Sequence, residues 1–118
     1  MFKQPLNMPF VNMTPHAINL FVTNEEGIEN EIKITPSGET IRLNENWTEI
    51  KIVDGVPITE CSYTTDVKLP PVIDGLFYIV SAMVANAFKS RNDFLIPAQT
   101  LRNEENRIYG CTSLAIVN

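Results

Sequence analysis

Short runs that alternate apolar and polar residues, each closed by turn-forming residues, fill most of this chain and constrain its fold more than any other feature. A run of period two predicts a β-strand that turns one face toward the core. Such runs lie at 14–23, 31–35, 40–44, 47–53 and 56–63. Asp54-Gly55 separates the last two, and Asp-Gly is a strong signal for a tight β-hairpin turn.

A continuous apolar run followed by a helical pattern occupies residues 76–90. Residues 76–80 read LFYIV, which is typical of a strand buried on both faces. Ser81 fits a helix N-cap, and the helix should end near Ser90. Four residues of this helix fall on one apolar face and are expected in the core: Met83, Val84, Ala87 and Phe88. Further strands are expected at 94–101 and 107–117.

These elements predict one domain over residues 1–118, because no linker or repeat divides the chain. The expected fold class is α+β: a mostly antiparallel β-sheet with one main helix in the C-terminal half. Residues 1–12, which contain Pro5 and Pro9, are expected to form an N-terminal arm that packs on its own domain or on a neighbouring subunit.

The composition favours a soluble protein made inside a cell, without a membrane partner. No apolar stretch approaches the roughly 18 residues that cross a bilayer. The first residues lack the apolar block of a secretion signal. Cys61 and Cys111 are expected to be small buried apolar residues. Two cysteines and one histidine do not fit a zinc site, so neither a metal nor another cofactor is expected.

The net charge of −5 argues against general binding of duplex nucleic acid, which needs many phosphate contacts. The charge is unevenly distributed. Residues 1–88 hold five basic and eleven acidic side chains, whereas residues 89–118 hold four basic and three acidic ones. Three of the four arginines lie in that last segment, and arginine grips phosphate with a planar fork. An ordinary mixed-charge surface explains the same counts equally well.

No motif indicates catalysis. The chain has no phosphate-binding glycine loop and no nucleophile elbow. A nucleophilic pair of Cys111 and His16, oriented by Asp93, can be drawn, but almost any chain with a cysteine and a histidine permits such a drawing. His16 fits a structural hydrogen bond in the Thr-Pro-His turn better than a ligand contact, which stays the alternative.

The candidate binding residues combine aromatic, amide and cationic side chains. If Phe77 and Tyr78 lie on a strand, they point to opposite faces, so one can pack in the core while the other stacks on a base. Asn86, Asn92 and Asp93 can contact ring edges or ribose hydroxyls. The alternative for Phe77 is core packing alone.

The arginines follow distinct elements. Arg42 lies in the run at 40–44, Arg91 follows the helix, and Arg102 and Arg107 flank a polar turn. Either one or two of them face a phosphate-bearing ligand, or they pair with Glu104 and Glu105 across the turn, which stabilises little at a surface.

Several stretches together resemble the phage-encoded Thoeris anti-defence proteins of the first type. They read NMTPHAINL near the start, SGETIRL in the middle, and GLFYIVSAMVANA, LRNE and RIYGC toward the end. The resemblance covers most of the chain except about 44–74. Members of this family bind cyclic ADP-ribose isomers made by a bacterial immune TIR-domain protein, and sequester them without cleavage.

The resemblance implies further expectations. It implies a protein in the cytoplasm of the infected bacterial host, assembled as a homodimer or as a hexamer built from dimers, with ligand pockets between subunits. Some members also hold cyclic oligonucleotides. By motif, Phe77 would stack on the adenine, Arg102 would hold the pyrophosphate, and Asn86 or Asn92 would add polar contacts. Arg42 matches the middle motif without an assigned role.

Two alternatives stay open beside this sequestering protein, which would not be an enzyme. One is an enzyme that degrades such a nucleotide. The other is a structural or protein-binding phage module, in which the arginine-rich segment meets an acidic partner.

Overall fold

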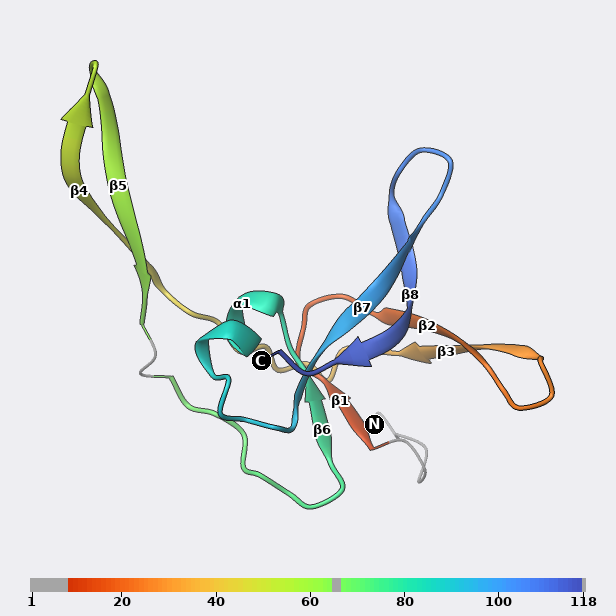
Figure 1. Cartoon of the computed structure of the whole chain (residues 1–118). Coiled ribbons are helices and arrows are strands. Elements are labelled where there is room, and N and C mark those ends of the chain that lie inside the picture. The colour runs from red at the N-terminus through yellow and green to blue at the C-terminus, as the bar shows by residue number, and fades with distance from the viewer. Residues whose placement is uncertain (1–8, 65–66, 118) are drawn as a thin grey trace.

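The computed structural model describes residues 9–64 and 67–117. Within them lie eight strands and one short helix, traced along the chain in Figure 1. They are β1 (Phe10–Asn12), β2 (Ile18–Thr23), β3 (Glu29–Ile34), β4 (Glu45–Val53), β5 (Val56–Tyr63), β6 (Phe77–Ile79), α1 (Ala82–Ala87), β7 (Phe94–Arg102) and β8 (Ile108–Ala115). None of the described residues forms a helix long and apolar enough to cross a membrane.

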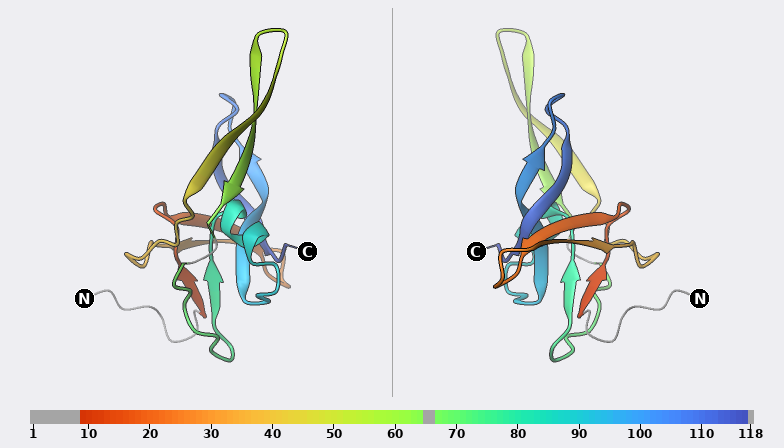
Figure 2. Two further views of the ribbon diagram at one scale, coloured as in Figure 1. Left: turned by 90° about the vertical axis from the view of Figure 1, so that its left-hand side faces the viewer. Right: turned by 90° about the vertical axis from the view of Figure 1, so that its right-hand side faces the viewer.

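Six strands form one curled sheet in the order β1-β6-β7-β8-β2-β3, and β4 and β5 form a separate two-stranded ribbon. In the larger sheet three neighbouring pairs are parallel: β1 with β6, β6 with β7, and β2 with β8. Only β7–β8 and β2–β3 are antiparallel. Figure 2 shows the curvature of the sheet from two sides.

The predicted fold class, an α+β domain with a mostly antiparallel sheet, is therefore wrong. The described chain is nearly all β, its main sheet has more parallel than antiparallel pairs, and its helix has only six residues. Alternation along a strand reports which face is buried, but it does not report the direction of the neighbouring strand. Here α1 is the crossover that lets β6 and β7 run parallel.

The helix begins as predicted and ends early. The Ser81 Oγ accepts a hydrogen bond from the Val84 N–H at 3.3 Å, which confirms Ser81 as the N-cap. The helix ends at Ala87 with Phe88 as its C-cap, three residues before the predicted end. Val84 and Ala85 are buried, whereas Met83 is 38% exposed, so Met83 is not a core residue.

The hydrophobic core lies between α1 and the sheet. Its buried members come from segments far apart in the sequence: Met13, Ile41, Tyr78, Val80, Val84, Ala85 and Phe94. Ile41 belongs to the stretch at 40–44, which is not a strand but crosses the core as irregular chain. The end of the expected N-terminal arm, residues 10–12, is strand β1 of the sheet, and residues 1–8 lie outside the described residues.

Asn12, at the end of β1, joins three segments. Its side-chain amide donates to the carbonyl oxygens of His16 at 2.8 Å and of Ile34 at 3.0 Å. Its Oδ1 accepts from the backbone N–H and the hydroxyl of Thr14. The side chain is almost wholly buried, at 1% exposure. It thereby fixes β1 and the 13–16 turn against the end of β3.

Gly110 allows β8 to approach β2 closely. A Cβ at this position would meet the Phe21 ring and would lie 2.9 Å from the Asn19 carbonyl oxygen. We expect Gly110→Ala to lower the free energy of unfolding by about 1–3 kcal/mol, because the backbone carbonyl cannot move away without disturbing β2. Urea denaturation measures this difference. In a Phe21→Leu background the same change should cost less if the Phe21 ring contributes, and an equal cost would assign the effect to the Asn19 carbonyl alone. A Gly110→Ala variant as stable as the wild type would contradict the steric explanation.

Candidate functional site

A cavity of about 410 Å³ lies beside the start of β6. We call it the Phe77 cavity. It is bounded by residues 72–77, which lead into β6, and by residues 90–93, which join α1 to β7. The parallel pairing of Tyr78 with Phe94 places these two segments side by side. The cavity therefore collects three of the predicted site residues, Phe77, Arg91 and Asn92.

Phe77 is half-buried at the rim of the sheet. Its ring centroid lies 6.0 Å from that of Phe10 on the neighbouring strand, and the two rings are tilted by 37°. Tyr78, by contrast, is buried, donates its hydroxyl hydrogen to the Pro71 carbonyl at 2.8 Å, and packs edge-on against Phe94. The prediction that these adjacent aromatic residues take opposite faces is confirmed, and Phe77 is the one that borders the cavity.

Arg91 forms a two-pronged pair with Asp93. Its Nε and Nη2 atoms each donate to one carboxylate oxygen of Asp93 at 2.8 Å. The Arg91 guanidinium carbon also lies 4.4 Å from the ring centroid of Phe94, a cation–π contact. The two side chains are only 15% and 11% exposed. This pair fixes one wall of the cavity.

The pair perturbs both groups in the direction expected for ionic partners. Hydrogen bonds from Arg91 hold the pKa of the Asp93 carboxyl below its usual value, and burial opposes that effect. The same hydrogen bonds raise the pKa of the Arg91 guanidinium. Each Asp93 oxygen accepts one hydrogen bond from Arg91, so the carboxylate is held by Arg91 and only its remaining lone pairs could accept from the edge of a ligand ring.

The two predicted asparagines lie apart. Asn92 is exposed and borders the Phe77 cavity. Asn86 is exposed on α1, and its Nδ2 donates to the Ala82 carbonyl one turn earlier at 2.8 Å. Asn86 does not border the Phe77 cavity.

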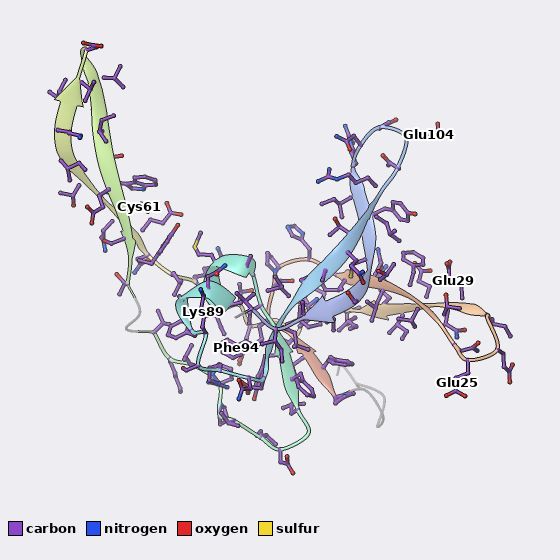
Figure 3. All side chains as sticks on the ribbon, viewed as in Figure 1. Glu25, Glu29, Cys61, Lys89, Phe94 and Glu104 are labelled. Carbon is purple, nitrogen blue, oxygen red and sulfur yellow. The ribbon has the colours of Figure 1, made fainter. Side chains whose placement is uncertain are left out.

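Arg102 and Arg107 flank the turn between β7 and β8, whose tip carries Glu104 in Figure 3. Arg102 donates to the Asn106 carbonyl at 2.9 Å, which steadies the turn. Arg107 Nε lies 3.8 Å from Glu105, and both side chains are at least 74% exposed. Phe94 and Arg102 are the two ends of β7, eight residue steps and roughly 26 Å apart at the usual rise. Within one chain, neither arginine reaches the Phe77 cavity.

Arg42 borders a different hollow. Two adjoining cavities, of about 680 and 270 Å³, share Met13, Thr40, Ile41 and Arg42 in their walls. We call them together the Arg42 groove. The larger lies between residues 39–42 and 67–71, so Lys68 joins Arg42 there. The sequence reasoning missed Lys68, because it lies in an irregular stretch with no pattern to mark it.

His16 is exposed, and the structural hydrogen bonds of its turn use its backbone rather than its ring. The His16 carbonyl accepts from the Asn12 amide and from the Thr14 hydroxyl. His16 therefore takes part in structural hydrogen bonds of this turn as predicted, but through its backbone carbonyl and not through its imidazole ring.

The cysteines do not pair with one another. Cys111 is buried as predicted, burial raises the pKa of its thiol, and the sulfur lies 3.8 Å from the Asn19 carbonyl. A thiol with a raised pKa is a poor nucleophile at neutral pH. Cys61 is only half-buried, on the exposed hairpin, which contradicts the prediction for that residue. The described part of the chain contains no group of histidine, cysteine or acidic side chains that could hold a metal ion.

No protein-family model, no curated protein and no solved structure matches this chain.

Proposed function

We propose that this chain binds a cyclic ADP-ribose isomer at the Phe77 cavity and sequesters it without cleavage, so that it inhibits Thoeris defence in the cytoplasm of an infected bacterium. The observation that carries the proposal is the grouping of an aromatic ring, a guanidinium and an amide around one cavity, from Phe77, Arg91 and Asn92. A volume of about 410 Å³ falls in the range of small-molecule sites.

Each of these groups suits one part of such a ligand. The Phe77 ring offers a stacking surface for adenine, which contributes about 1–3 kcal/mol per stacked base. The exposed Asn92 amide can donate to and accept from the edge of the base or the ribose hydroxyls. Arg91 uses two of its five N–H groups for Asp93, which leaves three for other acceptors.

Arg102 requires a second subunit if it is to hold the pyrophosphate. It lies at the far end of β7 from the Phe77 cavity, so the proposed complete site combines the cavity of one protomer with Arg102 of another. This agrees with the homodimer, or hexamer built from dimers, that the family resemblance implies. A cavity closed by a second copy can also enclose a ligand more fully than one small domain can.

Binding should depend on Phe77 through stacking. We expect Phe77→Ala to weaken binding of a cyclic ADP-ribose isomer by about 5- to 100-fold, measured by titration calorimetry. Phe77→Leu is the matched control for packing, because it keeps apolar volume against Phe10 but has no aromatic ring. A Phe77→Leu variant that binds as tightly as the wild type would assign Phe77 to packing alone.

Binding should also depend on Arg102. We expect Arg102→Ala to weaken binding by about 10- to 100-fold, the usual loss for a hydrogen bond to a charged group, with only a small fall in melting temperature from the lost hydrogen bond to the Asn106 carbonyl. Lys89→Ala is the control for general loss of positive charge, because Lys89 is exposed and borders neither cavity. Equal affinities for wild type and Arg102→Ala would remove Arg102 from the site.

The fate of the ligand separates a sequestering protein from an enzyme. The protein is incubated with the ligand, heated until it unfolds, and the released molecule is identified by mass spectrometry. We expect the intact isomer. A converted product would instead support the enzyme that degrades the nucleotide.

A structural or protein-binding phage module is the second candidate function. The exposed apolar side chains of the β4–β5 ribbon favour it, because surfaces of that kind mark contacts with other proteins. That function predicts no heat of binding with cyclic ADP-ribose isomers or with cyclic oligonucleotides, so the same calorimetry tests it.

A further inference from the structure

The β4–β5 hairpin projects from the body of the protein. Its strands pair only with each other, and Figures 1 and 2 show it reaching away from the six-stranded sheet. Asp54 and Gly55 form its turn with φ values of 50° and 80°, as a tight hairpin requires. Every residue of both strands is exposed except Cys61, which is half-buried. The predicted strands are present, but the expected burial of one face in this chain's own core is wrong.

A hairpin of this kind is not stable by itself. Two strands without further packing are at best marginally stable in water. This one also exposes seven large apolar side chains: Trp47, Ile50, Ile52, Val53, Val56, Ile58 and Tyr63. Monomeric proteins rarely leave an apolar surface of that extent uncovered. Another surface must therefore cover the hairpin.

The two faces of the hairpin differ in charge. Residues paired across the two strands point their side chains to the same side of the ribbon. Glu45, Trp47, Glu49 and Ile52 therefore lie with Tyr63 on one side. We call this the Trp47 face. A hydrogen bond from the Trp47 ring to the Glu45 carboxylate, 3.2 Å long, holds these two side chains together. The Trp47 face carries no basic residue, whereas Lys51 lies on the opposite face with Ile58.

The Arg42 groove has the complementary chemistry. Arg42 and Lys68 stand in its walls, and neither is in an ion pair with any residue that the structure describes. Met13, Ile41 and Leu69 give it an apolar lining. Glu39 is the one acidic residue of the larger cavity, and Glu45, at the base of the hairpin, lines the smaller one. The larger cavity, with two cationic side chains and one carboxylate, thus complements the acidic apolar Trp47 face in both charge and hydrophobicity.

We propose that the Trp47 face of one chain docks into the larger cavity of the Arg42 groove of a second copy, while the hairpin of that copy docks in the same way into the first. The groove is formed by the segments that lead into and out of the hairpin, so a chain whose hairpin projects away from its body leaves its own groove open. A twofold axis makes the exchange reciprocal, and the two contacts are then identical. A nine-residue strand, about 30 Å long, gives the hairpin the reach to cross to its partner.

This inference rests on exposure and charge, not on the ligand. It names the surfaces that join two copies, whatever the Phe77 cavity holds. A dimer that binds no nucleotide would leave it standing, and a monomer that binds the nucleotide would overturn it while leaving the proposed site in one chain.

Sedimentation velocity of the full chain over a range of concentrations tests the contact. We expect a dimer, and we expect Trp47→Thr with Ile52→Thr to weaken dimerisation by about 100-fold or more, because central aromatic anchors carry most of such contacts. Both changes keep strand-forming residues in place. Ile28→Thr is the matched control, because Ile28 is similarly exposed at the β2–β3 turn, and it should dimerise as the wild type does.

Tryptophan fluorescence gives a direct readout. Trp47 is the sole tryptophan of the chain, and 63% of it is exposed in the single copy. Docking should shift its emission to shorter wavelength as the protein concentration rises through the dimerisation range. An emission maximum that does not change between monomer and dimer would overturn the placement of Trp47 in the interface.

A charge exchange between two variants tests the pairing of hairpin with groove and does not depend on apolar changes that can harm folding. One variant carries Glu45→Lys and Glu49→Lys, and the other carries Arg42→Glu and Lys68→Glu. Each alone should dimerise at least about 10-fold more weakly than the wild type, because like charges then meet. Mixed together, they should form a heterodimer in which both contacts join opposite charges.

Three further outcomes would overturn the proposal. One is a wild-type chain that stays monomeric at about 100 μM, which would mean that a foreign protein covers the hairpin. Another is a dimer that the Trp47 and Ile52 changes do not weaken. The third is a mixture of the two charge variants that associates no better than either variant alone.

Discussion

An alanine at position 12 should lower the free energy of unfolding by about 3 kcal/mol. The Asn12 side chain is buried and takes part in four hydrogen bonds, with His16, Ile34 and two groups of Thr14. Each such bond contributes about 1 kcal/mol, and leaving buried carbonyl groups without donors costs more. Urea denaturation followed by circular dichroism measures the difference.

Two further variants separate the hydrogen bonds from the volume of the side chain. Asn12→Asp keeps the shape but has no hydrogen-bond donor when ionised, so it should destabilise at least as much as Asn12→Ala. Asn19→Ala removes one longer hydrogen bond, 3.3 Å to the Tyr109 carbonyl, and should cost less than about 1 kcal/mol. If Asn12→Ala costs no more than Asn19→Ala, the junction at Asn12 does not hold the sheet together.

An alanine at position 93 should lower the free energy of unfolding by about 2–3 kcal/mol. It leaves the largely buried Arg91 guanidinium without its carboxylate partner, and breaking a buried pair from one side is strongly destabilising. Breaking a fully buried pair costs about 3–5 kcal/mol, and the partial exposure of both side chains reduces the expected loss of stability to about 2–3 kcal/mol. Arg91→Met with Asp93→Ala should cost less than the sum of the two single changes, because no unpaired charge then remains.

The same pair should make stability depend on pH in the acid range. The folded-state pKa of Asp93 lies below its unfolded value, so its contribution is complete above about pH 4. The contribution is lost as the pH falls through the unfolded pKa and then the folded one. The wild type should therefore lose more stability than Asp93→Ala between about pH 5 and pH 2. Parallel losses in the two proteins would show that the pair does not contribute.

Local signals in the sequence predicted those features that depend on neighbouring residues. The Asp54-Gly55 turn and the Ser81 N-cap each depend on backbone geometry within a few residues, and both are confirmed. The burial of the run at 76–80 is confirmed for Tyr78, Ile79 and Val80. A continuous apolar run is also typical of a strand in a parallel sheet, so the same pattern was consistent with the parallel pairing of β6.

The strand order and the strand directions depend on pairing between distant segments, and the sequence did not predict them. The parallel partners of β1 and β2 lie 67 and 91 residues further along the chain, at Phe10–Phe77 and Leu20–Cys111, and no local pattern indicates them. The apolar alternation of β4 and β5 predicted strands correctly, but the surface that covers them is not in this chain's own sheet.

The sequence predicted individual residues of the candidate site, but which of them lie together depends on the long-range strand pairing. Phe77 and Asn92 come together because β6 and β7 are parallel neighbours, whereas Arg102 lies at the opposite end of β7. Arg91 was expected to face a ligand, and its two-residue spacing from Asp93 was the available sign of an ion pair. Asn12 was missed as a structural residue, although an asparagine two residues before a threonine and three before a proline is a common way to begin a turn.

The strand order has a consequence for how the protein is made. Both edges of the six-stranded sheet, β1 and β3, belong to the first third of the chain, and its middle is built from β6, β7 and β8. During synthesis the β2–β3 and β4–β5 hairpins can form early. The middle strands of the six-stranded sheet, β6, β7 and β8, have not yet been made at that point. Contacts so distant in sequence make folding slow. Strands β1 and β2 thus lack their parallel partners until β6 and β8 have been synthesised, and their apolar side chains stay accessible to chaperones until then.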